Sequence, residues 1–276
     1  MEIPLFPLHT VLCPGIVLPL HIFEDRYRAL TRHCLDTGEP FGVVLIREGA
    51  ESGAPRRPLA LAGVGALVEI REAGRYPDGR YDLLAAATGR FTIQTVDPGR
   101  EPYLVADVTP LEDEVGDETR AERLSASAIR RFVRYLELMR ARDGETSEVL
   151  DIRVEVDSGD GTETATDLDV EDENATDIDA AEPAAATDRG AAATEDPPVD
   201  RRRDLVIPDD PTVLSYLLSG IVQLELPRRQ ALLEAATTVI RLEALIRLLD
   251  REVLLLGHRL RLFSPDHGSL RGPRRS

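Results

Sequence analysis

The stretch "IPLFPLHTVLCPGIVLPLHIF" (residues 3–23) is almost wholly apolar, so it is either a segment bound for a membrane or the first strands of a folded domain. A membrane-spanning helix needs about 20 apolar residues whose backbone groups are all bonded within the helix. Four prolines in this stretch each remove a backbone donor and resist helical geometry: Pro4, Pro7, Pro14 and Pro19. We therefore predict two short strands, residues 3–8 and 11–20, that are broken near Pro14-Gly15.

The same stretch does not have the features of an export signal. A secretory signal needs a positively charged start and an unbroken apolar core. Here only Glu2 lies between Met1 and the apolar run. Cys13 and Cys34 are the only cysteines in the chain. We therefore expect a cytoplasmic protein with two reduced thiols, not a disulfide scaffold.

The net charge of −17 comes from one segment of the chain. Residues 143–200 contain 20 acidic and 2 basic side chains, which gives −18, and the remaining residues contain 30 acidic and 31 basic side chains. The rest of the chain therefore lacks the basic excess that is typical of nucleic-acid-binding surfaces. Residues 143–203 also contain few large apolar side chains, so we predict that they form a disordered acidic insertion.

The chain contains no lysine, because all 33 of its basic residues are arginine. This absence excludes a Schiff base, a lysine general base and a phosphate-loop lysine. The sequence also has no G-x-S-x-G, H-E-x-x-H, C-x-x-C or dinucleotide-binding motif. Its histidines and cysteines do not have the spacing of a standard zinc site. We therefore expect no catalytic residues, no cofactor and no metal.

The first half of the chain is predicted to be rich in strands, with one early helix. In "FEDRYRALTRHCLDTG" the apolar residues Phe23, Tyr27, Leu30 and Cys34 lie on one helical face. Strand patterns follow at 41–48 and through 62–111, with "YPDG" (76–79) as a turn. Alternation within "RYDLLAAATGRFTIQTV" places Arg90 on the face opposite Phe91. The simplest arrangement is a twisted antiparallel sheet of six or seven strands that curls into a small barrel.

The rest of the chain is predicted to be helical on both sides of the acidic segment. A helix is expected at 117–142, and a cap at Asp209 or Asp210 begins a second helical region. Pro227 opens another helix, and a last helix is expected to end before Gly257. The fold class is therefore α+β. The predicted division is 1–116 (β-rich), 117–142 (helix), 143–203 (acidic insertion), 204–263 (helical) and 264–276 (loose tail).

Three stretches resemble the N-terminal substrate-binding domain of Lon-type ATP-dependent proteases, and most closely the short bacterial proteins that carry this domain alone. They are "PLFPLHTVLCPGIVLPLHIFEDRYRAL", "FGVVLIREG" and "DDPTVLSYLLSGIVQLELPRRQALLEAATTVIRLEALIRLL". The resemblance implies a PUA-like barrel whose first hairpin is the opening stretch, followed by a helical bundle, with the acidic segment inserted between them. It also implies no ATPase or peptidase activity, since the family's phosphate-loop lysine and serine–lysine dyad lie in later domains.

The resemblance further implies a non-enzymatic protein-binding module that engages unfolded or partner polypeptides in an apolar groove between barrel and bundle. The candidate binding residues are Pro19, Leu20, Phe23, Glu24, Arg26 and Tyr27. Most of them also have an ordinary structural explanation, because Phe23 and Tyr27 share a helical face that can simply be core. The alternative function is RNA binding, which PUA-like barrels often have, but the near-neutral charge outside the acidic segment argues against it. No membrane partner is expected.

Deleting residues 143–203 is expected to leave the unfolding midpoint and the cooperativity of unfolding nearly unchanged, because long surface insertions add little loop-closure free energy. Thermal melting followed by circular dichroism, on the intact chain and on the deletion, checks this. A loss of cooperative unfolding in the deletion would show that the segment is part of the fold.

Overall fold

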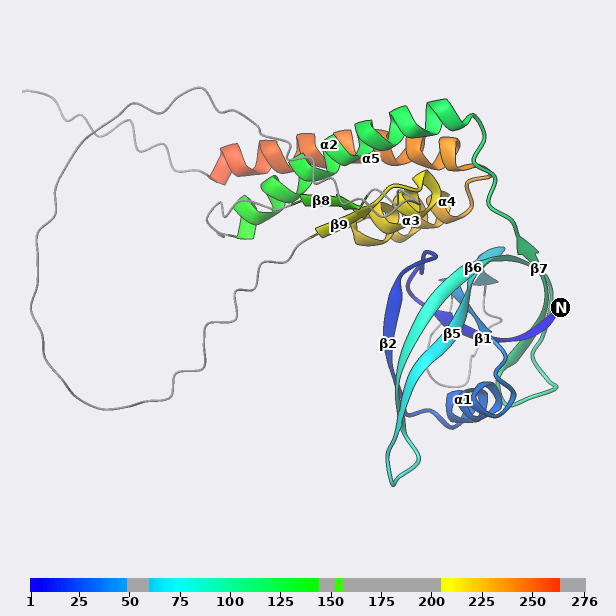
Figure 1. Cartoon of the computed structure of the whole chain (residues 1–276). Coiled ribbons are helices and arrows are strands. Elements are labelled where there is room, and N and C mark those ends of the chain that lie inside the picture. The colour runs from blue at the N-terminus through cyan, green and yellow to red at the C-terminus, as the bar shows by residue number, and fades with distance from the viewer. Residues whose placement is uncertain (49–59, 144–151, 156–204, 264–276) are drawn as a thin grey trace, which may run out of the picture. The chain divides into compact units, whose positions relative to one another are not determined.

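Five strands of the N-terminal half close into a barrel in a computed structural model, which describes residues 1–48, 60–143, 152–155 and 205–263. The strands of its main sheet are β1 (Glu2–Leu8), β2 (Val17–Ile22), β3 (Phe41–Glu48), β4 (Ala60–Leu61), β5 (Val64–Arg75), β6 (Tyr81–Asp97) and β7 (Leu104–Leu111). Their order is β1-β7-β6-β5-β3-β4, and a parallel pairing of β1 with β3 closes the sheet (Figure 1). The predicted α+β class, a small curled sheet followed by helices, is confirmed.

The opening stretch does not form the hairpin that was predicted from the sequence. β1 pairs with β3 and β7, whereas β2 pairs with β6. The second strand begins at Val17 and not at residue 11, because residues 9–16 form a connection that buries three apolar side chains: Val11, Leu12 and Cys13. Gly15 has a φ of 81°, which favours glycine, and its N–H donates to the carbonyl of Ala87 at 2.9 Å.

The length of β6 determines the position of β2. β6 has 17 residues. Its first part, from Tyr81 to Ala86, pairs with β2 on one side and β5 on the other, and its later part pairs with β7. Register shifts in the β5–β6 and β6–β7 ladders bend the sheet along the length of β6. Within the described chain, β2 therefore has one strand neighbour and lies at the margin of the sheet.

Helix α1 (Asp25–Thr37) packs against the barrel core through one face. Its buried residues are Tyr27, Leu30, Thr31 and Cys34. The helix ends at Gly38, whose φ of 72° is the left-handed conformation common at helix C-termini. The predicted helical face is confirmed except for Phe23, which lies before the helix and is exposed.

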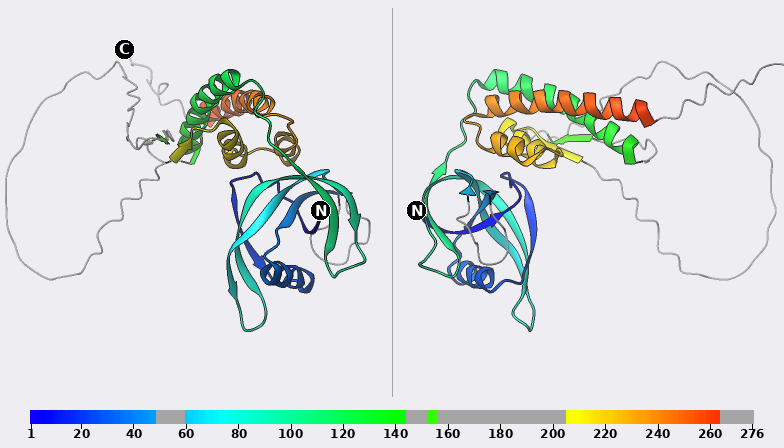
Figure 2. Two further views of the ribbon diagram at one scale, coloured as in Figure 1. Left: turned by 45° about the vertical axis from the view of Figure 1, so that its right-hand side comes forward. Right: turned by 180° about the vertical axis from the view of Figure 1, so that it is seen from behind.

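Four helices make up the second half of the described chain: α2 (Glu118–Asp143), α3 (Pro211–Ile221), α4 (Leu226–Leu233) and α5 (Thr238–Phe263). The long helices α2 and α5 lie side by side (Figures 1 and 2), and an ion pair of 2.6 Å joins Arg131 to Asp250. None of the described helices is long and apolar enough to cross a membrane.

The ends of these helices follow the sequence signals in part. Of the two candidate caps, Asp209 and Asp210, it is Asp210 that caps α3, and its carboxylate accepts hydrogen bonds from the N–H groups of Thr212 and Val213 at 2.7 and 3.0 Å. The predicted end of the last helix before Gly257 is wrong, because α5 continues to Phe263. A glycine inside a helix costs only about 1 kcal/mol relative to alanine, which the rest of a 26-residue helix can offset.

The barrel and helices α2–α5 belong to one compact unit, and the described residues between 149 and 207 belong to a second. In the second unit, β8 (Ile152–Glu155) pairs with β9 (Leu205–Pro208), which extends one residue beyond it. The segment predicted to be disordered, 143–203, thus contains one described strand, and apart from Asp143 the rest of it lies outside the described residues. So does the predicted loose tail, 264–276. The predicted division into domains stays a prediction.

Replacing Gly65 by alanine is expected to lower the free energy of unfolding by about 1–3 kcal/mol, the usual range for overpacking a core. A Cβ at Gly65 would lie 2.5 Å from Cζ of the buried Phe91 and 2.6 Å from the carbonyl oxygen of Val43, which is backbone and cannot turn aside. Gly63→Ala is the control, because its Cβ would meet no atom within 4 Å. Urea unfolding measures both, and equal losses would contradict the steric explanation.

Candidate functional site

A small pocket lies where β1 and β2 end and α1 begins. Its lining residues are Phe6, Leu8, His21, Ile22, Phe23, Glu24 and Tyr27. The pocket has a volume of about 190 Å³. An apolar cavity of about 150 Å³ is known to take a benzene ring, so this pocket has room for one large apolar side chain.

Two stacked aromatic rings form the floor of the pocket. The rings of Phe6 and Tyr27 are 4.0 Å apart between centroids and inclined by 16°. The guanidinium of Arg26 lies 4.4 Å from the centroid of the Tyr27 ring, and its Nε donates to Oε2 of Glu24 at 3.0 Å. Arg26 therefore fixes both an aromatic ring and the carboxylate that forms one wall.

Phe23 forms an exposed wall of the pocket. Its side chain is 59% exposed, although the helical pattern predicted that it would share the buried face of α1. That prediction is wrong because Glu24 is the N-cap, with extended backbone angles, and α1 begins only at Asp25. The ring of His21 stacks beside Phe23 with centroids 6.3 Å apart. Phe23 therefore exposes a large apolar side chain at the rim of the pocket.

The pocket brings together three of the six predicted binding residues: Phe23, Glu24 and Tyr27. Arg26 lies behind this group and acts through Glu24. Pro19 and Leu20 precede the pocket on β2, where Pro19 is exposed and Leu20 is half-buried against the barrel core. A direct contact of these six residues with a ligand stays a prediction.

Four lining residues were missed by the sequence analysis: Phe6, Leu8, His21 and Ile22. The alternation of β2 gives a signal for Ile22, whose side chain points to the core side. No local pattern identifies Phe6 and Leu8, because they reach the pocket from β1, which is not a neighbour of β2 in the sheet.

A polar cluster holds His21 beside the pocket. Nδ1 of His21 lies 2.6 Å from Oδ1 of Asp82, and the hydroxyl of Tyr76 donates to the other oxygen of the same carboxylate. The hydrogen bond from Tyr76 lowers the pKa of Asp82, and the same bond raises the pKa of Tyr76. Asp82 therefore stays ionised at neutral pH and can accept from both neighbours.

The two thiols of the chain are not activated for chemistry. Burial raises the pKa of Cys13 to about 11 and that of Cys34 to about 12. Both are protonated at neutral pH, and a protonated thiol is a poor nucleophile and metal ligand. Over the ranges that the structure describes, no three histidine, cysteine or acidic side chains lie close enough to hold a metal ion.

The candidate residues do not lie in a groove between barrel and helices, so that prediction is wrong for them. The pocket is lined by residues of the barrel and of the start of α1 alone. Where the barrel meets the helices, Tyr216 and Leu233 instead join a buried cluster with barrel residues such as Val11 and Leu45. Buried side chains therefore occupy this part of the junction.

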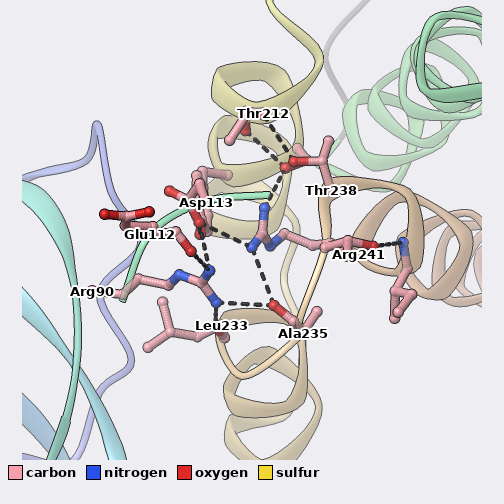
Figure 3. A network of polar contacts seen from close by, with 12 residues as sticks. Arg90, Glu112, Asp113, Thr212, Leu233, Ala235, Thr238 and Arg241 are labelled. Atoms are coloured by element: carbon pink, nitrogen blue, oxygen red, sulfur yellow. Dashed lines mark hydrogen bonds and ion pairs between the residues drawn. The ribbon is translucent and has the colours of Figure 1, made fainter. Parts of the chain in front are cut away.

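Two buried arginines bind the end of α4, one from the barrel and one from α5 (Figure 3). Arg90 of β6 is 3% exposed, and its Nη1 donates to the carbonyls of Leu233 and Ala235 at 2.8 and 2.9 Å. Arg241 of α5 is fully buried, and its Nε donates to the carbonyl of Leu232 at 3.1 Å. Carbonyls at a helix C-terminus lack helical partners and carry partial negative charge, so both guanidiniums are well placed there.

One carboxylate serves both arginines. Oδ1 of Asp113 lies 2.5 Å from Arg90 and 3.6 Å from Arg241, and it also accepts from the hydroxyl of Tyr216. The guanidinium of Arg241 lies 3.7 Å from the centroid of the Tyr216 ring. Burial lowers the pKa of Arg241, but arginine remains charged in proteins. The charge of Asp113, the cation–π contact with Tyr216 and the hydrogen bonds to backbone carbonyls together offset the free-energy cost of removing the Arg241 guanidinium from water.

The family of the chain follows from a match to a family model over residues 2–251, described as the ATP-dependent protease La (LON) substrate-binding domain. The chain belongs to this family. A solved N-terminal domain of Mycobacterium avium complex Lon protease supports the fold, with a TM-score of 0.51, 18% identity, and coverage of 91% of this chain and 98% of that one. A Lon N-terminal domain protein from Xanthomonas campestris has a TM-score of 0.47 and 22% identity, with coverage of 90% and 98%.

Two Lon proteases match part of this chain, and the matched region is a small part of each of them. A Lon protease of Flavobacterium johnsoniae is 28% identical over 123 residues, which are 44% of this chain and 15% of the relative. A Lon protease of Azorhizobium caulinodans is 28% identical over 138 residues, 49% of this chain and 16% of the relative. The match thus covers about a sixth of each relative.

Replacing Asp113 by asparagine is expected to lower the free energy of unfolding by about 3 kcal/mol, because it leaves two buried guanidiniums without a counter-charge. The side chain of Asp113 is 27% exposed, which places the loss at the low end of the range for buried ion pairs. Asp250→Asn is the control, since Asp250 pairs with Arg131 at the surface and should cost less than about 1 kcal/mol. Chemical denaturation of both variants measures the difference, and equal losses would remove the network from its structural role.

Proposed function

We propose that this chain is a non-catalytic module that binds unfolded or extended polypeptide segments at the pocket beside Phe23. The observation that carries the proposal is the exposed Phe23 ring next to a floor of stacked aromatic rings. Membership of a substrate-binding domain family supports it. The lack of lysine supports binding without ATP hydrolysis or cleavage by a serine–lysine dyad.

The chemistry of the pocket suits partners that have lost their fold. Large apolar side chains are mostly buried in folded proteins and become available when the chain opens. Burying one of them stabilises a complex by about 1.5–3 kcal/mol, which alone gives only weak binding. A pocket of this size therefore favours tolerant, low-affinity capture of many unfolded chains over tight recognition of one folded surface.

Polypeptide is a better match for this pocket than RNA. No arginine lines the pocket, and the one carboxylate that does, Glu24, would repel a phosphate. RNA recognition generally combines phosphate contacts from basic residues with stacking on aromatic rings. The pocket offers the aromatic rings but not the basic residues.

Replacing Phe23 by alanine is expected to weaken binding of an unfolded model protein by about tenfold or more, because one anchoring contact is lost. The probe is fluorescently labelled α-lactalbumin that has been reduced and carboxamidomethylated, and its binding is followed by fluorescence anisotropy. The midpoint of thermal unfolding should hardly change, since the Phe23 side chain is 59% exposed.

The control is Leu254→Ala, which removes an apolar side chain that is 72% exposed on α5 and far from the pocket in sequence. This variant should bind the probe as the original chain does. If both variants lose affinity equally, the probe binds to exposed apolar surface in general and not to the pocket. If the original chain does not bind the probe at all, the proposed function is wrong.

A further inference from the structure

The backbone of β2 presents an open edge to solvent in the described structure. The N–H of Ala87 donates to the carbonyl of Ile16 at 3.0 Å, and the β2–β6 register then runs without a shift to the end of β2. Hydrogen bonds alternate along an antiparallel pair. Alternate residues of β2 therefore direct their N–H and C=O groups away from β6, and these residues are Val17, Pro19 and His21.

This edge carries little of the protection that natural sheet edges have. Edges are usually guarded by charged side chains, prolines or bulges. The strand "VLPLHI" contains no acidic residue, lysine or arginine. Pro19 is its one guard, because it faces outward and offers a carbonyl but no N–H. Val17 and His21 each offer both groups to an incoming strand.

We propose that an extended polypeptide segment pairs with the outer edge of β2 and inserts one large apolar side chain into the pocket. This proposal rests on the proposed function and specifies how the polypeptide would bind. Directly opposed residues in a sheet place their side chains on the same face. A residue opposite Ile22 would therefore point to the side on which Ile22 is 2% exposed and lines the pocket. The outer edge of β2 therefore ends at the pocket, because Ile22 is the last residue of β2 and lines the pocket.

Charge complementarity selects the occupant. Glu24 is the one carboxylate of the pocket wall, and its Oε2 accepts from Arg26 while no arginine lines the pocket itself. A segment with a basic residue next to its apolar anchor is therefore favoured, and an acidic neighbour is disfavoured. A second copy of β2 is a poorer occupant, because it has no basic residue and would bring a second proline to the paired edge.

The first test changes the backbone of the partner. The probe is a fluorescein-labelled nine-residue peptide with one phenylalanine between two arginines and threonine or valine elsewhere. Two further versions carry N-methyl groups on alternate residues, one on the odd and one on the even positions. One pattern should weaken binding by about tenfold or more, because it removes the donors that face β2, and the other should leave binding nearly unchanged.

The second test changes the edge itself. Pro19→Ala adds an outward N–H, so it should tighten peptide binding by about two- to tenfold, the effect of one more hydrogen bond. The control is Pro102→Ala, at an exposed loop position between β6 and β7, which should leave affinity unchanged. Thermal melting of both variants shows that the barrel is intact.

The outcomes separate this inference from the proposed function. Binding that is lost in Phe23→Ala, weakened equally by both methylation patterns and unaffected by Pro19→Ala overturns edge pairing and keeps the proposed function. If neither the peptide nor unfolded α-lactalbumin binds, both the proposed function and this inference are overturned.

Discussion

The end of helix α4 is the point on which the arrangement of barrel and helices depends. Its last carbonyls have no helical donors and must be satisfied inside the protein. Arg90 reaches them from the barrel and Arg241 reaches them from α5, while Asp113, which follows β7, balances the charge. Three segments that are distant in sequence are thus held to one helix end (Figure 3). A shift of the barrel against α4 would separate Arg90 from its acceptors and leave a charge buried without partners.

The network explains why the junction is specific, although its polar contacts add little net stability. Burying charges costs several kcal/mol per group, and good geometry offsets this cost without exceeding it by much. The apolar cluster that includes Tyr216 and Leu233 supplies the hydrophobic contribution. Apolar contacts alone tolerate many relative positions of two surfaces, whereas hydrogen bonds to a buried guanidinium tolerate few. The polar groups therefore select one relative position of barrel and helices among those that the apolar contacts allow.

Much of the fold could be predicted from the sequence, because alternation, helical periodicity and caps are local signals. Asp210 before Pro211 is an example, and the structure confirms its capping role. The candidate site could be predicted only in part, because β1, β2 and the start of α1 are brought together by the topology of the barrel and not by a local sequence pattern. Alternation put Arg90 and Phe91 on opposite faces of β6, yet both are buried, since α4 covers the face of Arg90. Phe23 was assigned to a buried helical face because the pattern could not show that α1 starts two residues later.

The open edge of β2 and the filled junction between barrel and helices both follow from the order of the strands in the sheet. Closing a barrel of five strands uses both edges of β1, so β2 can enter the sheet only where β6 extends past β7. A strand added in this way has one partner and keeps half of its backbone groups unpaired. At the junction the carbonyls of the buried residues Leu232, Leu233 and Ala235 accept hydrogen bonds from the two arginines, as buried carbonyls need partners within the chain. At the margin of the barrel the unmatched groups are exposed to water, and water can be displaced by another chain. The fold thus bonds the carbonyls at the end of α4 within the chain and leaves the outer backbone groups of β2 to solvent beside its pocket.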